Sequence, residues 1–256
     1  MSKMSKKNYK IFSINTYAEA NQEFIKNDGE VFNFKDLLKV LETDNGYHFR
    51  IHKNTQYIFF GDLDNYNSNI QIFIDILHNF MNDKYNLIFT DDEFKYTKNN
   101  KNKNSYHYSI PKWNLTTEKL KEIHTILLKE YSDEFIYKSE KVKKRSIDTS
   151  IYSEHWFRCP NQKKGINIDD KSKHKIIKGN MEDFIIDYIP EISKNINNVG
   201  ILTDLLIRLE NEIKIKNEEK IKSIIKLLSP LEIMLLLKHF FEEETRIKIV
   251  NCYLSK

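Results

Sequence analysis

Two aspartates, Asp62 and Asp64, follow an apolar run from Tyr57 to Phe60, with one residue between them. Side chains alternate faces along a strand, so this spacing predicts that both carboxylates project together from the end of a buried strand. Carboxylates this close repel each other unless a proton or cation lies between them, and Mg²⁺ or Mn²⁺ favours such oxygen ligands. The alternative is a strand followed by a polar turn from Asp64 to Asn67. Taken alone, the short and common D-x-D pattern favours the turn.

A second candidate site is formed by Ser105 and His107. Strand alternation places the hydroxyl and the imidazole on one face, where both are able to hydrogen-bond phosphate oxygens. The preceding Lys/Asn-rich segment 98–104 supplies positive charge nearby. The alternative for His107 is an ordinary strand histidine.

A third carboxylate, Asp148, ends a short apolar step in the segment from Arg145 to Tyr152. Three carboxylates around two cations suit nucleotidyl transfer, because one metal activates a 3′-hydroxyl and both stabilise charge on the phosphoryl group. The alternative is a capping or turn aspartate that precedes Thr149 and Ser150.

Arg158 lies in an apolar run that reads as a strand, and Lys163 and Lys164 follow in a predicted loop. An unpaired guanidinium is costly to bury, and an anionic ligand such as phosphate would satisfy it with two hydrogen bonds. The alternative is a structural ion pair for Arg158 and solvated lysines.

The four motifs occur in a fixed order: D-x-D, S-x-H, a hydrophobic residue followed by Asp, and a strand that bears arginine. In this order they resemble the archaeo-eukaryotic primase superfamily, and most closely the primase portion of poxvirus-type and giant-virus primase–helicase proteins. The third motif there resembles S-I-D-x-x-[VI]-Y followed by an arginine-bearing strand, which Ser146 to Tyr152 and Phe157-Arg158 match. The resemblance covers roughly residues 45–180.

This resemblance implies a role for each motif. Asp62, Asp64 and Asp148 would bind two catalytic divalent ions, Mg²⁺ or Mn²⁺. Ser105 and His107 would hold the phosphates of the incoming nucleotide, and Arg158 would face the nucleotide with help from Lys163 or Lys164. The implied fold is an α/β-type unit plus an RRM-like unit, with the active site between them. The sequence departs from the related viral proteins because it has no Walker A pattern for a fused helicase and no cysteine cluster for a zinc module.

The leading hypothesis is therefore a primase or primase-polymerase that makes or extends primers on a single-stranded DNA template from NTPs or dNTPs. A replicative helicase, separate or fused, is an expected partner. The alternatives are a metal-dependent nuclease and a non-catalytic nucleic-acid-binding or adaptor module. The Ser/His/Arg set favours the polymerase over the nuclease, since a nuclease has no triphosphate to hold.

Hydrophobic periodicity predicts an α+β fold in which a catalytic core over residues 1–190 precedes a C-terminal helical segment over 191–256. Residues 1–9 are expected to be a disordered tail, and Asn33 to cap a helix. Helices are predicted over 16–27, 34–43, 69–84, 116–131 and 181–188. Strands are predicted over 47–52 and 56–62 as a hairpin, and over 87–90, 105–110 (ending at Pro111), 147–152, 156–159 and 174–178. A loop is predicted over 91–104.

The composition permits a sizeable folded core, since 40% of the 256 residues are hydrophobic and 12% are aromatic. The net charge of +4 is compatible with nucleic-acid binding without requiring it. Two distant cysteines, Cys159 and Cys252, suggest no disulfide framework and fit a reducing compartment. The sequence shows no secretory signal and no apolar stretch of membrane-spanning length, so we expect a cytoplasmic protein or one at a viral replication site, with no membrane partner.

Overall fold

The computed structural model describes residues 7–14, 29–99, 104–138, 143–166 and 173–197, and also residues 219–221, 225, 247, 250, 251 and 254. The chain divides into two compact units, Met1–Asn197 and Asn198–Lys256. Most of the predicted C-terminal helical segment and all of the predicted helix over 16–27 lie outside the described residues. No helix among the described residues is long and apolar enough to cross a membrane.

The larger sheet of the first unit has the strand order β10-β5-β6-β11, and β4 also pairs with β6. All its pairings are antiparallel except that of β11 with β6. Its strands are β4 (Gln56–Leu63), β5 (Lys95–Asn99), β6 (Tyr106–Thr116), β10 (His174–Lys178) and β11 (Lys194–Asn195). The mixed helix and strand content confirms the predicted α+β class.

Strand β6 continues past Pro111 to Thr116, so the predicted strand end at this proline was wrong. Ile58 of β4 pairs with Asn114 of β6, whereas the next residue, Phe59, pairs with Ile110. The residues between the two partners form a bulge, and a bulge tolerates the missing N–H of proline.

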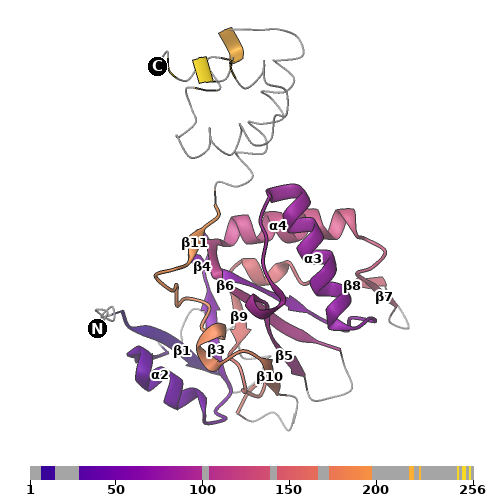
Figure 1. Cartoon of the computed structure of the whole chain (residues 1–256). Helices are drawn as coiled ribbons and strands as arrows, with labels where there is room; N and C mark the ends of the chain where they lie inside the picture. The colour runs from indigo at the N-terminus through magenta and orange to yellow at the C-terminus, as the bar shows by residue number, and fades with distance from the viewer. Residues whose placement is uncertain are drawn as a thin grey trace. The chain divides into compact units, whose positions relative to one another are not determined.

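Two helices, α3 (Ile70–Tyr85) and α4 (Thr117–Glu130), lie together beside the larger sheet (Figure 1). Each begins at a polar cap: the Asn69 side chain accepts a hydrogen bond from the Gln71 N–H, and Thr116 accepts one from Lys119. The helix predicted over 69–84 is confirmed, and its apolar residues at helical spacing are buried: Ile70, Phe73, Ile74, Leu77 and Phe80. Ring contacts join the helices to the sheet, with Phe73 4.9 Å from Tyr108 and His124 5.3 Å from Phe59.

The second sheet has the order β2-β1-β3-β9 and is antiparallel. Its strands are β1 (Tyr9–Ser13), β2 (Glu30–Phe32), β3 (Tyr47–Ile51) and β9 (His155–Arg158), and α2 (Phe34–Leu41) follows β2. Asn33 caps α2 as predicted, since its side chain accepts the Asp36 N–H. Tyr9, the last residue of the expected tail, instead begins β1, because its ring is buried against Phe34 and Tyr188.

The predicted hairpin between 47–52 and 56–62 was wrong, although both segments are strands. β3 pairs with β1 and β9, whereas β4 pairs with β6 in the other sheet. The connection carries the chain from one sheet to the other, and Asn54 takes a left-handed conformation there (φ 54°). The two sheets meet where Phe157 of β9 packs against Phe60 of β4, with ring centroids 4.9 Å apart.

Several short segments also differ from the sequence predictions. Residues 87–90 form no strand, and the predicted loop over 91–104 contains β5. The predicted strand over 147–152 is an isolated bridge at Ile147 followed by a 3₁₀ turn, and the predicted helix over 181–188 is also a 3₁₀ turn. The remaining short elements are η1 (Asp91–Glu93), β7 (Ile136–Lys138), β8 (Lys143–Arg145), η2 (Ser150–Tyr152) and η3 (Met181–Phe184).

Candidate active site

The end of β4 is joined to the segment around Asp148 by an isolated antiparallel bridge between Leu63 and Ile147. Two backbone hydrogen bonds flank the bridge, from the Asp64 N–H to the Ser146 carbonyl (2.6 Å) and from the Asp148 N–H to the Asp62 carbonyl (3.2 Å). This pattern places Asp62 opposite Asp148. Because side chains alternate along paired strands, Asp62, Asp64 and Asp148 lie on the same face. The backbone therefore places the three predicted carboxylates on one face of the paired segments.

Asp62 is the most perturbed of the three carboxylates. Its side chain is 17% exposed, and its Oδ1 is buried without a hydrogen-bond partner in the described part of the chain. Burial raises the pKa of Asp62 well above its usual range, and the charges of Asp64 and Asp148 raise it further. Arg158 and Lys164 oppose this increase in the pKa. A cation next to Asp62 would relieve both the burial cost and the repulsion.

The three carboxylates share a face but do not converge on one point. Among the described residues, no three His, Cys, Asp or Glu side chains are placed to hold one metal ion together. Asp148 Oδ1 instead accepts hydrogen bonds from the Ser150 N–H (2.8 Å) and hydroxyl (2.6 Å). Asp64 and Asp148 both line an open cavity of about 360 Å³ next to Arg145. Coordination by all three carboxylates therefore requires the Asp148 side chain to leave its turn.

His107 lies directly opposite Asp62 in the β4–β6 ladder. Its Nε2 is 3.8 Å from Asp62 Oδ1, which is too long for a hydrogen bond. The His107 ring is stacked between Phe157 (4.4 Å) and His174 (3.8 Å). Burial lowers the pKa of His107 well below its usual range, and the neighbouring His174 and Arg158 lower it further. The ring is therefore neutral at physiological pH, and its single N–H is engaged by a backbone hydrogen bond at Arg158.

His174 is a site residue that the sequence motifs missed. It begins β10, is 3% exposed, and its Nδ1 lies 3.2 Å from the Thr97 hydroxyl. Thr97 is on β5, and the pairing of β10 with β5 sets the imidazole over His107. The sequence signal was a lone histidine at the start of a strand. Nothing in the spacing indicated that this strand borders β5.

The three cations predicted to bind phosphate, Arg158, Lys163 and Lys164, differ in whether they act on the Asp62 carboxylate. Arg158 is 8% exposed, and its charge affects the pKa values of Asp62, His107 and His174. Lys164 affects the pKa values of Asp62 and His174, so it also borders the carboxylates. Lys163 is held through its backbone, whose N–H donates to Asp44 Oδ1 (2.8 Å). Arg158 and Lys164 are therefore the cations that the structure associates with Asp62.

Ser105 is buried and has a backbone partner. Its hydroxyl oxygen accepts a hydrogen bond from the Asn65 N–H (3.1 Å). Asn65 has a left-handed conformation (φ 48°) immediately after Asp64. Ser105 therefore fixes the turn that follows the aspartate pair, and its role in binding phosphate stays a prediction.

No protein-family model matches this sequence, and a search of curated proteins finds no match. The assignment of chemistry to this face therefore depends on the geometry of its residues and on the order of the motifs.

Proposed function

We propose that this chain is a metal-dependent, template-directed nucleotidyltransferase of the primase-polymerase type, acting on single-stranded DNA with NTPs or dNTPs. One observation carries the proposal. A buried, unpartnered carboxylate oxygen of Asp62 lies on a face that Asp64 and Asp148 share, with His107 opposite and Arg158 nearby. The carboxylates on this face suit cations, and the neighbouring His107 and Arg158 suit phosphates.

The carboxylates fit a divalent ion. Asp62 Oδ1 lacks a donor in the described residues, and its pKa is raised by burial and by two neighbouring carboxylates. These are conditions that Mg²⁺ or Mn²⁺ would relieve, because both ions favour carboxylate oxygens. When bound, such ions supply charge stabilisation of a phosphoryl group and activation of a 3′-hydroxyl. Asp62 and Asp64 would hold them, joined by Asp148 once it leaves its turn.

The residues opposite the carboxylates suit a triphosphate. Arg158 and Lys164 supply fixed positive charge. His107 lies next to Asp62, and the single N–H of its neutral ring would have to exchange its bond to the Arg158 backbone for one to a phosphate. The stack of Phe157, His107 and His174 keeps the imidazole in one orientation. The chain's own work in the reaction is to position the α-phosphate for in-line attack and to hold the pyrophosphate as it leaves.

The arrangement of the elements also supports an RRM-like unit. Strand β4, helix α3, strands β5 and β6, helix α4 and, after the short β7–β8 pair, the bridge at Ile147 occur in the order strand–helix–strand–strand–helix–bridge. In the sheet, Ile147 borders β4, which borders β6, which borders β5, all antiparallel. In this proposal the second sheet, with β9, belongs to the other unit of a primase core, and the carboxylates lie between the two.

The test is incorporation of labelled NTP or dNTP on a single-stranded template with Mg²⁺ or Mn²⁺. We expect Asp62→Asn and Asp148→Asn to reduce incorporation by roughly a hundredfold or more, since groups that only support a metal ligand already contribute about 10- to 100-fold. Asp83→Asn, a matched change at an exposed position near the end of α3, should leave incorporation unchanged.

The outcomes separate the competing functions. Full incorporation by Asp62→Asn would contradict the metal assignment. Hydrolysis of DNA without incorporation would assign the carboxylates to a nuclease. Binding of single-stranded DNA with neither reaction would make the chain a non-catalytic module.

A further inference from the structure

A second cavity, of about 240 Å³, opens at the other end of β4 from the carboxylates. It lies where β1 leaves β3: these strands pair at Phe12–His48 and Ser13–Tyr47, and toward its start β1 pairs with β2. The cavity borders Gln56 and Tyr57, whereas Asp62 lies near the end of the same strand. At about 3.3 Å per residue, the two sites are roughly 20 Å apart.

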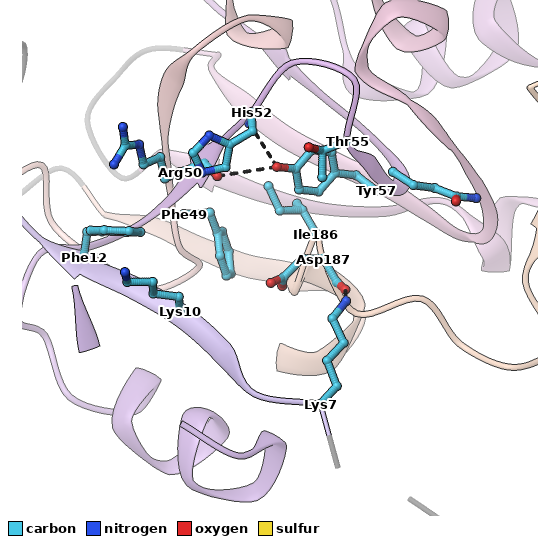
Figure 2. Close-up of a pocket in the computed structure, with 11 residues that line it drawn as sticks. Lys7, Lys10, Phe12, Phe49, Arg50, His52, Thr55, Tyr57, Ile186 and Asp187 are labelled. Carbon is cyan, nitrogen blue, oxygen red and sulfur yellow. Dashed lines mark hydrogen bonds between the residues drawn. The ribbon is translucent and has the colours of Figure 1, made fainter. Parts of the chain in front are cut away.

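The lining of this cavity combines cations with aromatic rings. Lys7, Lys10 and Arg50 supply the positive charge, and Phe12, Phe49 and Tyr57 supply the rings. Figure 2 shows Phe49, Ile186 and Asp187 between the two lysines and the His52 and Tyr57 side chains. The Tyr57 hydroxyl is fixed in place because it accepts the His52 N–H (3.0 Å).

Asp187 introduces an acceptor into this otherwise cationic cavity. Its Oδ1 is buried and has no hydrogen-bond partner among the residues that the structure describes. The Lys7 ammonium bonds to the Asp187 backbone carbonyl (2.5 Å) and not to this oxygen. Burial raises the pKa of Asp187 to about 6, with Lys7 opposing the increase, so the carboxyl is largely ionised at neutral pH.

The three features together suit a nucleotide. Lysines bind phosphate, aromatic rings stack on bases, and a buried carboxylate oxygen needs an N–H donor. A nucleotide meets all three requirements, because it carries a phosphate, a planar base and, on that base, an N–H donor. A simple anion meets only the first of them, and an apolar ligand meets only the second.

We propose that this cavity binds one nucleotide, with its phosphate against Lys10 and Lys7 and its base among the aromatic rings, donating an N–H to Asp187 Oδ1. The site does not depend on the proposed activity. The nucleotide is either free or part of a single strand, and the two sources share this chemistry.

The test measures binding in EDTA, where metal at the carboxylates contributes nothing. The probe is a short fluorescein-labelled single-stranded oligonucleotide that contains guanosine, and the competitors are GMP and inorganic phosphate. We expect Lys10→Ala to weaken oligonucleotide binding several-fold and to lower the salt slope by about one. Lys39→Ala, an equal loss of charge at an exposed position on α2, should leave both unchanged.

Asp187→Asn distinguishes a nucleotide site from a surface that binds anions by charge alone, because it should affect GMP and inorganic phosphate in opposite directions. The change removes negative charge, so inorganic phosphate should bind more tightly, whereas GMP loses its charge-assisted hydrogen bond. The ratio of the GMP affinity to the phosphate affinity should therefore fall about tenfold. Equal effects on GMP and phosphate, or equal effects of Lys10→Ala and Lys39→Ala, would overturn the proposal.

Two further measurements complete the test. One distinguishes a free nucleotide from a single strand, and the other distinguishes this cavity from the proposed active site. Displacement of the oligonucleotide by an equal concentration of GMP assigns the cavity to a free nucleotide, and binding only of the oligonucleotide assigns it to a strand. Asp62→Asn should reduce incorporation by roughly a hundredfold or more, as proposed above, and leave this binding intact. Loss of the Lys10-dependent binding in Asp62→Asn would show that the cavity is not a separate site.

Discussion

At the scale of single residues, we expect the Asp62 carboxylate to lower the free energy of unfolding of the protein. An ionised carboxylate whose Oδ1 is buried without a partner costs free energy, and the raised pKa of Asp62 expresses this cost. We therefore expect Asp62→Asn to raise the free energy of unfolding in EDTA by about 1–2 kcal/mol at neutral pH, measured by urea denaturation.

The metal response of the same variant completes this prediction. Mg²⁺ or Mn²⁺ should raise the melting temperature of the unaltered protein, because an ion that binds the folded state stabilises it. Asp62→Asn should lose this increase, and Asp83→Asn should keep it. A wild-type melting temperature that is independent of either ion would contradict the proposed metal site.

At the scale of elements, Gly61 leaves room for the Tyr108 side chain of β6 to lie against β4. A Cβ atom at this position would overlap Cζ and Oη of Tyr108. The tyrosine cannot move aside easily, because its hydroxyl is hydrogen-bonded to His124 Nε2 (2.7 Å) and its ring stacks on Phe94. We expect Gly61→Ala to lower the free energy of unfolding by about 1–3 kcal/mol, measured by urea denaturation.

A double-mutant cycle checks the cause of this loss. Tyr108→Leu removes the atoms that the new methyl group would meet, so Gly61→Ala should cost less in that background, with a coupling of about 1 kcal/mol. Additive losses would show that the close contact with Tyr108 is not the reason that glycine is required.

The helices were easier to predict than the pairing of the strands. The stripe from Ile70 to Phe80 and the cap at Asn33 are local signals, and the structure confirms both. The hairpin of 47–52 with 56–62 failed because strand pairing is decided by distant segments: β1 and β9 take both edges of β3. Pro111 failed as a strand terminator because a bulge accommodates it.

At the scale of the first unit, the candidate site depends on contacts that no single motif contains. Asp62 and Asp148 meet through the bridge at Ile147, and His107 is held by Phe157 from the second sheet. Strand alternation predicted correctly that Asp62 shares a face with Asp64. The contribution of His174 was not predictable, because it requires β10 to lie beside β5. Both sheets therefore have to fold before this site exists.

The buried histidines make a further prediction for the folded unit as a whole. Burial lowers the pKa of His48 to about 3 and that of His124 to about 4, and it also lowers the pKa values of His107 and His174. In the unfolded chain these groups take up protons near pH 6.5, whereas in the folded chain they stay neutral. The unfolded state therefore binds more protons as the pH falls below about 6.5, and stability is lost over that range.

The expected size of this loss is up to about 1.4 kcal/mol per pH unit for each histidine. Asp62 and Asp187 oppose it in part, because a carboxyl with a raised pKa favours the folded state as the pH falls. Urea denaturation at about pH 7.5 and about pH 5.5 measures the difference. His124→Gln should reduce the pH dependence of the free energy of unfolding by the contribution of one buried histidine. His52→Gln, a change at a side chain that is 47% exposed, should not reduce it. A free energy of unfolding that stays constant between these pH values would contradict the burial of these four histidines in their neutral form.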